Sequence, residues 1–312
     1  MQTALYLTIV PSLLLCAVLG ANNLSTCLGT SIGSRRIRYS QALALASIGT
    51  IAGVLLEGSK LSHFVTSMVL SSTSPQFPVI VTVSTLTVMI FLTYRRLPIS
   101  LSQVAVGAAL GAALAAGIEV NWEFALLIAS SWILTPFVGF AIATLLSRLA
   151  ARIGKQVRGV FTQNIMYSYL TIVSGVYASY ALGANAVGLI LGMVDVPSSL
   201  HLLVSLTFGV ATILGMLFFS KGTTLSVAEN IVGLSPSASF ASQMGGAAAV
   251  HGFTQLGIPV SMSQAVVGGI FGAAISRKIV VRNYRLIREI ALGWTVAPLL
   301  GAILAIAITA IS

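Results

Sequence analysis

Ten apolar segments follow one another along the chain, separated by short polar stretches. Semi-polar stretches at 61–72 and 223–232 lie between them, and we expect these to be re-entrant or interfacial. A helix needs about 20 apolar residues to cross a bilayer, so the pattern predicts an all-α polytopic membrane protein. The apolar segments lie at 4–33, 41–58, 78–93, 99–117, 122–147, 163–194, 200–220, 236–251, 259–276 and 289–311.

The first and sixth segments are the longest, and both contain the same tripeptide. Gly-Ala-Asn occupies 20–22 in the first and 183–185 in the sixth. Glycine lets the backbone leave helical geometry, and a nearby asparagine can bond the polar groups that are then freed. We therefore predict a broken helix at each place, with Asn22 and Asn185 available to freed carbonyl groups or to a substrate.

The sequence repeats itself at a nearly constant offset. Residues 98–111 read PISLSQVAVGAALG, and residues 259–272 read PVSMSQAVVGGIFG. A tryptophan followed four positions later by proline also occurs twice, 162 positions apart. Two copies of five segments must enter the membrane from opposite sides, because five is odd. We predict two inverted-topology repeats, 1–160 and 161–312, with broken and re-entrant helices, as in many secondary transporters.

Composition supports the membrane assignment, since 57% of the residues are hydrophobic, 7% are charged and the mean hydropathy is +1.01. The net charge of +10 would suit a nucleic-acid-binding protein, but this hydropathy excludes that class. Short basic loops stay cytoplasmic, so we expect both termini outside and a multi-pass protein of the plasma membrane. Ten crossings place four basic clusters on one side: Arg35, Arg36 and Arg38; Arg95 and Arg96; Arg148, Arg152, Lys155 and Arg158; Arg277, Lys278, Arg282, Arg285 and Arg288.

The two repeated segments also carry the polar chemistry. Each begins with a proline followed by two serines, Ser100 and Ser102 in the first copy and Ser261 and Ser263 in the second. Proline favours the first turn of a helix, whose free N–H groups and positive dipole end can hold an anion. Small residues can also simply permit close helix packing. Because the pattern is duplicated, we favour an oxyanion site at the midplane, where the serine hydroxyls add donors.

Four longer stretches extend this pattern over nearly the whole chain. They are GANNLSTCLGTSIGS at 20–34, LPISLSQVAVGAALGA at 97–112, TTLSVAENIVGLSPSASFA at 223–241 and LGIPVSMSQAVVGGIFGAA at 256–274. In this order they resemble the inorganic phosphate transporter family, including its sulfate-permease-like relatives. The resemblance implies phosphate and sodium sites at these segments. By position it implicates Asn22, Asn23, Ser100, Ser102, Asn185, Ser261 and Ser263.

Several positions depart from the family pattern. Where the family has an aspartate after Gly-Ala-Asn, this chain has Asn23 and Ala186. A family asparagine is replaced by Thr26 in the first copy, and a family histidine by Gln103 and Gln264. Hard cations favour carboxylate oxygens, so these changes leave the coupling ion open between a proton and sodium. A bound sodium ion would be expected near Asn22, Asn23 and Asn185.

Three of the charged residues outside the basic clusters are candidates for a functional role. Lys60 and Lys221 are 161 positions apart, and they are either cations that attract the anion or side chains that extend to the interface. Glu57 could carry a coupling proton if buried, but we favour an ordinary pair with Lys60, one turn away. The three histidines are not related by the repeat, and their spacing is not that of metal ligands. We expect them to be interfacial or core residues: His63, His201 and His251.

The leading hypothesis is a secondary transporter that moves inorganic phosphate by alternating access, coupled to a proton or weakly to sodium. Sulfate or another oxyanion is the alternative substrate, and an anion channel is a further alternative that the inverted repeat disfavours. The spans carry no carboxylate pair or nucleophile–base arrangement typical of an enzyme, and we expect no cofactor. The family resemblance also suggests a homodimer.

Overall fold

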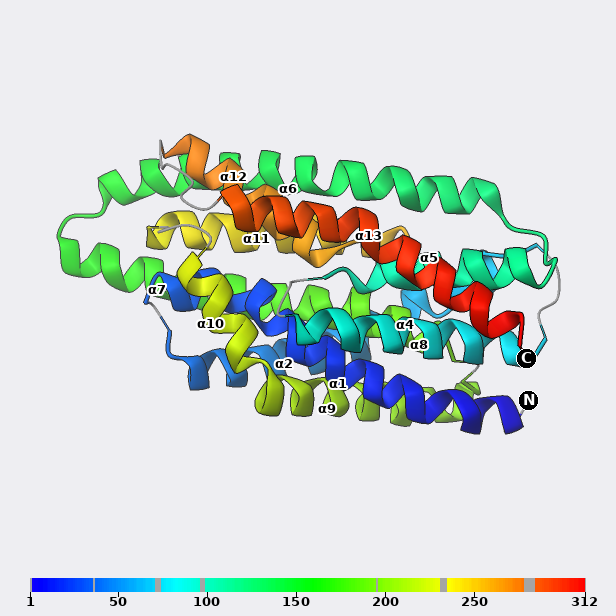
Figure 1. Cartoon of the computed structure of the whole chain (residues 1–312). Coiled ribbons are helices and arrows are strands. Elements are labelled where there is room, and N and C mark those ends of the chain that lie inside the picture. Colours follow the sequence, from blue (N-terminus) through cyan, green and yellow to red (C-terminus); the bar gives the residue numbers. More distant parts are fainter. Residues whose placement is uncertain are drawn as a thin grey trace.

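The computed structural model describes residues 2–35, 37–70, 74–95, 99–194, 196–230, 235–277 and 284–311. Four residues of the predicted basic clusters, Arg36, Arg96, Lys278 and Arg282, lie outside these ranges, as do Pro98 and Asp195. The described chain is almost entirely helical (Figure 1), which confirms the predicted fold class. The first half contains α1 (Gln2–Gly33), α2 (Tyr39–Glu57), η1 (Gly58–Leu61), α3 (Phe64–Ser67), α4 (Gln76–Tyr94), α5 (Leu101–Ala115) and α6 (Trp122–Gln156). The second contains α7 (Val160–Leu182), η2 (Gly183–Val187), α8 (Gly188–Leu191), η3 (Ser198–Leu200), α9 (His201–Phe219), α10 (Lys221–Asn230), α11 (Pro236–Gln255), α12 (Met262–Ser276) and α13 (Tyr284–Thr309).

Each of the ten apolar segments forms helix, but they do not all cross the membrane. Among the described residues, seven helices are long and apolar enough to do so. Helices α5 and α12 have 15 residues each, fewer than the ~20 that a crossing needs. The prediction of ten full spans is therefore wrong for these two helices, because extended chain before Leu101 and Met262 replaces their first turns. It is also wrong for α11, which has 20 residues but is not apolar enough to be among the seven.

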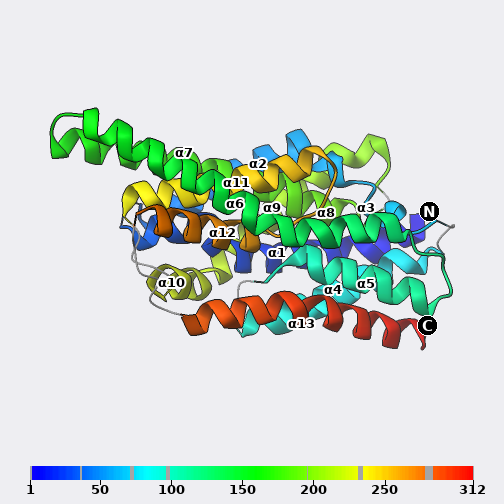
Figure 2. The ribbon, with the colours of Figure 1, turned by 90° about the horizontal axis from the view of Figure 1, so that it is seen from above.

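Two helical hairpins enter the molecule from opposite ends. Helices α4 and α5 both have their outer ends at the end that carries the two termini, whereas α11 and α12 have theirs at the other end (Figures 1 and 2). Helix α5 packs on α13, and α12 packs on α6 in the same way. Each short helix thus rests on the last long helix of the other half of the chain.

Glycines at equivalent positions allow these close contacts. A Cβ built on Gly107 of α5 would overlap the carbonyl oxygen of Pro298 on α13, and one on Gly268 of α12 would overlap that of Pro136 on α6. The positions differ by 161 residues for the glycines and by 162 for the prolines, the offsets at which the sequence repeats. Such reciprocal packing is expected of two oppositely oriented copies. The division at residue 160 stays a prediction.

The two Gly-Ala-Asn tripeptides do not break their helices as predicted. Helix α1 runs without interruption through 20–22, and at 183–185 the chain makes the π-helical turn η2. The reason is close packing, since a Cβ on Gly20 would overlap the carbonyl oxygen of Thr212, and one on Gly183 that of Thr50. The glycines admit a neighbouring backbone while their own stays helical.

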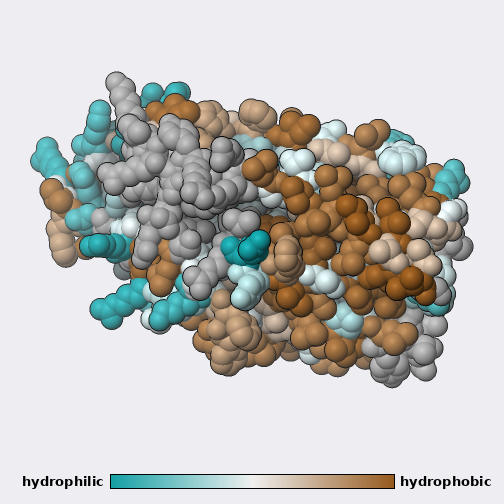
Figure 3. All heavy atoms as spheres, viewed as in Figure 1, coloured by the Kyte–Doolittle hydropathy of each residue, from teal (hydrophilic) through white to brown (hydrophobic). Residues whose placement is uncertain are grey.

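The surface has a wide apolar part, and its hydrophilic residues are most numerous at one end (Figure 3). Exposed leucine, isoleucine and phenylalanine side chains are numerous, for example Leu126, Ile133 and Phe137 on α6. The hydrophilic atoms gather at the end where α6 leads into α7 (Figures 1 and 3), and the exposed Arg152 and Lys155 lie in the last turns of α6. This distribution suits an integral membrane protein whose apolar belt faces lipid.

Candidate functional site

The two short helices begin near the middle of the molecule with the same cap. Ser100 is the N-cap of α5, and its Oγ accepts a hydrogen bond from the amide of Gln103 at 3.4 Å. Ser261 is the N-cap of α12, and its Oγ accepts from the amide of Gln264 at 3.3 Å. Both serines are in extended conformation and are buried. A serine cap satisfies one of the free N–H groups of a helix start and leaves others available to a ligand.

A second serine follows each cap. The Oγ atoms of Ser100 and Ser102 lie 3.1 Å apart, and those of Ser261 and Ser263 lie 2.9 Å apart. A hydroxyl both donates and accepts, so each pair can turn one proton towards an anion while the other bridges the two oxygens.

The extended chain before each short helix is held by the side chain of a buried asparagine. The Oδ1 atom of Asn22 on α1 accepts a hydrogen bond from the amide of Ile99 at 3.1 Å. The Oδ1 atom of Asn185 on η2 accepts from the amide of Val260 at 3.3 Å. The amide of a buried extended segment needs such a partner, because leaving it unpaired is costly.

The other end of each asparagine side chain is fixed by a threonine. Asn22 Nδ2 donates to Thr93 Oγ1 at 3.4 Å, and Asn185 Nδ2 donates to Thr254 Oγ1 at 2.9 Å. Sequence reasoning alone missed these two threonines. Their 161-residue separation, equal to that of the serines, is a signal that could have found them.

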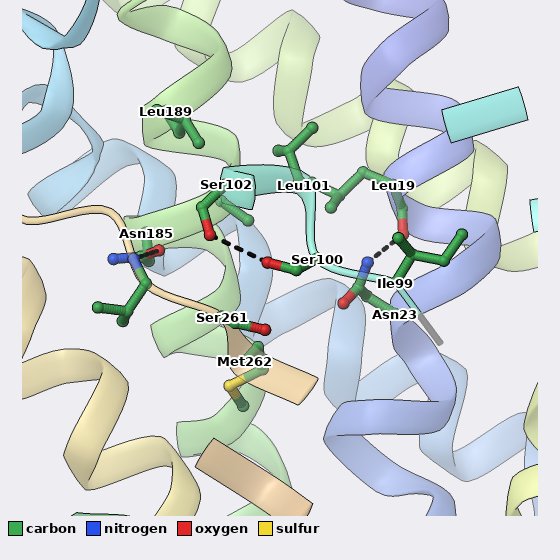
Figure 4. A pocket seen from close by; sticks show the side chains of 12 residues that line it. Leu19, Asn23, Ile99, Ser100, Leu101, Ser102, Asn185, Leu189, Ser261 and Met262 are labelled. Atoms are coloured by element: carbon green, nitrogen blue, oxygen red, sulfur yellow. Dashed lines mark hydrogen bonds between the residues drawn. The ribbon is translucent and has the colours of Figure 1, made fainter. Parts of the chain in front are cut away.

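These segments enclose a small pocket between the two halves (Figure 4). The serines of the two segments face a common space, with Asn23 of α1 on one side and Asn185 of η2 on the other. Polar groups therefore come from both copies of the repeated sequence, and none of the lining side chains is charged. The lining residues are Leu19, Asn23, Ile99, Ser100, Leu101, Ser102, Asn185, Ala186, Leu189, Val260, Ser261 and Met262.

The predicted site residues divide between this pocket and its surroundings. Asn22 and Ser263 are bonded to lining segments without lining the pocket themselves. Thr26, Gln103 and Gln264 are buried nearby in sequence but are not among the lining residues. Those that line the pocket are Asn23, Ser100, Ser102, Asn185 and Ser261.

The charged candidates lie outside the pocket lining. Lys60 and Lys221 are exposed, and Lys60 Nζ is 3.5 Å from Glu57 Oε1. The i,i+3 pair favoured from the sequence is therefore present. Glu57 has a second partner that the sequence did not indicate, His251, whose Nε2 lies 2.8 Å from Glu57 Oε2.

The two positions where the family pattern has aspartate both line the pocket. Asn23 donates from Nδ2 to the carbonyl oxygen of Leu19 at 3.1 Å, and Ala186 offers only a methyl group. Two negative charges are thus absent from this lining. An anion meets less repulsion here, and a cation finds fewer strong ligands.

Comparison of the sequence with known proteins identifies the family. The family model of the phosphate transporter family matches residues 19–305. A provisionally named phosphate permease of Methanocaldococcus jannaschii is 31% identical over 310 residues, which cover 97% of this chain and 96% of the relative. The chain belongs to the phosphate transporter family. A provisionally named phosphate permease of Haemophilus influenzae is 24% identical over an alignment that covers 93% of this chain and 92% of the relative.

The fold of this phosphate transporter family member is also that of a solved structure. The structure described as the sodium-dependent phosphate transporter matches with a TM-score of 0.87, covering 99% of this chain and 98% of that one, at 20% identity. The family resemblance and the expectation of a transporter rather than an enzyme are thereby confirmed.

Proposed function

We propose that this protein moves inorganic phosphate across the membrane by alternating access, and that the anion binds in the pocket between the starts of α5 and α12. The observation that supports this most is the convergence of Ser100 and Ser261, the caps of two symmetry-related helices, on one uncharged pocket. Helix starts supply N–H donors and a positive dipole end without a full charge, so an anion can be held and released.

The asparagines support the pocket rather than bind the anion alone. Asn22 and Asn185 hold the amides of Ile99 and Val260, which fixes the direction in which each helix start points. Preorganised donors bind more tightly because they need no reordering when the ligand arrives.

The two hairpins suggest how the pocket opens to either side. Helices α4 and α5 reach the pocket from one end, and α11 and α12 reach it from the other. With repeats 1–160 and 161–312, rocking of one half against the other would expose the pocket alternately. We expect the protein in the plasma membrane, and the homodimer stays a prediction.

Sulfate is the second candidate substrate, and the chemistry of the residues that line the pocket is compatible with it. Phosphate at neutral pH carries protons that a carboxylate could accept, whereas sulfate carries none. No carboxylate lines the pocket. Hydroxyl and amide oxygens are the side-chain acceptors there, and they discriminate less strongly between the two anions.

The coupling ion is proposed to be a proton, with weak dependence on sodium. Asn23 and Ala186 provide one neutral amide where two carboxylates would compensate a sodium ion for its lost hydration. A neutral oxygen site can bind sodium, but less strongly.

Uptake of radiolabelled phosphate and sulfate into proteoliposomes tests these proposals, with sodium and pH gradients imposed separately. We expect phosphate uptake that follows the pH gradient and persists when potassium replaces sodium. Absence of uptake of either anion would contradict transport by this site. Uptake that collapses without sodium would contradict proton coupling alone.

A further inference from the structure

A cluster of titratable side chains lies outside the pocket, where the two halves of the chain meet. Glu57, at the end of α2, has its Oε2 atom 2.8 Å from His251 Nε2 and 2.8 Å from Gln255 Nε2, both on α11. Lys60 of η1 contacts both Glu57 and the Gln255 amide oxygen. About one fifth of each side chain of the Glu57–His251 pair is exposed, 19% and 23%. The pair is therefore shielded but within reach of a proton.

The remaining ring nitrogen of His251 is bonded as well. Tyr177 of α7 places its hydroxyl 2.6 Å from Nδ1, and the ring of Tyr180 lies edge-on to the imidazole with centroids 5.6 Å apart. A carboxylate only accepts hydrogen bonds, so Nε2 carries the proton donated to Glu57, and Nδ1 accepts from Tyr177.

This arrangement can take up one proton without losing a hydrogen bond. A proton added at Nδ1 produces an imidazolium, and the Nδ1–H then donates to the Tyr177 oxygen, since a hydroxyl can accept as well as donate. Histidine is the side chain that ordinarily changes charge near neutral pH. The added proton raises the net charge of the cluster by one unit.

Three further titratable side chains lie against the pair. Lys60 on η1 and Tyr177 and Tyr180 on α7 are the titratable side chains that the described interactions place against it. Helix α9 also packs on α2, but its His201 is directed to Ser205, with Nδ1 3.5 Å from the hydroxyl.

The cluster exists on one side of the internal repeat. At the offsets of the repeated sequence, Glu57 corresponds to Phe219, His251 to Ile90 and Tyr177 to Leu14. The equivalent place in the other half therefore carries neither the carboxylate nor the imidazole, although Lys221 corresponds to Lys60. A group needed only to hold the repeats together would be expected twice, whereas a single coupling site needs one copy.

The cluster is linked to the pocket through α11. Thr254 lies one turn after His251 on this helix and accepts the hydrogen bond of Asn185, which lines the pocket. On the other side, Gly58, the residue after Glu57, packs against Gly188, three residues after Asn185. A change in the Glu57–His251 contact can therefore reach Asn185 by two routes, through Thr254 on α11 and through the Gly58–Gly188 contact.

We propose that Glu57 and His251 form the proton-binding site that couples the pH gradient to anion transport, an inference that rests on the proposed function. The proton enters at Nδ1 of His251, and the added positive charge favours occupancy of the pocket by the anion. Return of the neutral imidazole after release of the proton lowers that occupancy.

The test uses the full-length protein in sodium-free liposomes, with two measurements on the same preparation. One is accumulation of radiolabelled phosphate driven by an acidic exterior. The other is phosphate–phosphate exchange at equal pH on both sides, which needs the pocket but no net proton movement. The variants are H251Q and E57Q, and the exposed His63 gives the matched control H63Q.

We expect wild type and H63Q to accumulate and exchange phosphate, while H251Q and E57Q exchange it but lose accumulation. H251Q decides the matter even if E57Q does not fold, because Glu57 then keeps Lys60 and Gln255. Accumulation that survives in H251Q would overturn the inference, since the proton would travel on the substrate. Loss of exchange in folded H251Q at saturating phosphate would also overturn it, since the proton raises occupancy of the pocket without being required for it. Absence of exchange in the wild type would instead overturn the proposed function.

Discussion

Asn185 illustrates how a buried side chain can serve a binding site through the backbone beside it. Its Oδ1 accepts from the amide of Val260 and its Nδ2 donates to Thr254, so both ends of the amide group are used by the protein. Each bond contributes about 1 kcal/mol, but an unpaired partner costs up to about 3 kcal/mol. The anion is left to the serines and the amides of the helix starts.

Removal of either capping hydroxyl is expected to weaken phosphate binding. Ser100→Ala and Ser261→Ala each delete a donor whose charge-assisted bond is worth roughly 1.5–3 kcal/mol, about tenfold or more in affinity. Isothermal titration or a scintillation proximity assay on the purified variants measures the change.

Ser100→Gly separates binding from capping. Glycine costs only a few tenths of a kcal/mol at an N-cap compared with serine. If glycine restores affinity that alanine loses, the hydroxyl acts on the helix and not on the anion. Ser131→Ala, at a buried serine of α6 that bonds to Ile128, is the matched control with unchanged affinity expected.

Restoring carboxylates in the pocket is expected to change ion dependence. The double variant Asn23→Asp, Ala186→Asp places two hard anionic ligands where one neutral amide now lies. Sodium binding should strengthen because the ion recovers part of its hydration energy. Phosphate uptake as a function of sodium concentration measures this, and a curve identical to that of the wild type would contradict it.

At the scale of elements, the hairpins depend on backbone contacts that leave no room for a side chain. Gly107 and Gly268 let α5 and α12 approach the prolines of α13 and α6. In a membrane, helix association gains little from hydrophobic burial, so close packing of this kind stabilises the fold.

Gly107→Ala and Gly268→Ala should each lower the thermal stability of the detergent-solubilised protein and its transport rate. A methyl group would meet the carbonyl oxygen of Pro298 or Pro136, and overpacking typically costs about 1–3 kcal/mol. Gly252→Ala on α11 is the matched control, because the new methyl group would meet no neighbouring helix or side chain within 4 Å. Equal loss of melting temperature in all three variants would show that general helix effects dominate.

The elements and half of the site could be predicted from the sequence, because the period of the apolar residues and the capping preference of serine act locally and occur twice. The expectation that proline occupies the first turn is wrong for Pro259, which lies in the extended chain before α12. The helix starts at Ser100 and Ser261 are of this kind. The unbroken α1 could not be predicted, because the choice at Gly20 depends on Thr212, far away in the chain. The pairing of Glu57 with His251 joins residues 194 positions apart without a repeat relation, and nothing local indicates it.

At the scale of the whole molecule, the polar ends define an orientation. At one end, the last turns of α6 carry the exposed Arg152 and Lys155. The opposite end carries both termini (Figure 1), the exposed Glu119 just before α6, and the exposed Glu123 in the first turn of α6. Lysine and arginine in short loops are retained in the cytoplasm.

Cysteines introduced at Arg38 and Lys155 should react with a membrane-impermeant maleimide only from the cytoplasmic side, and one at Glu119 only from outside. Background labelling is expected to be low, because the native Cys16 and Cys27 are fully buried. Labelling of Lys155→Cys in intact cells would reverse the orientation and with it the side from which the coupling proton enters.

The exchange of partners between the halves has a consequence for the origin of the chain. Helix α5 rests on α13 and α12 rests on α6, so each half on its own leaves a glycine-faced surface without its complement. If the predicted halves 1–160 and 161–312 descend from one sequence, a single ancestral half would have needed a second copy inserted the other way round. Such an ancestor could not have carried a strong charge bias at either end, because both orientations had to be made from one polypeptide. The arginine-rich turns that now distinguish the two ends would then be later additions, made once fusion had freed each half to commit to one direction.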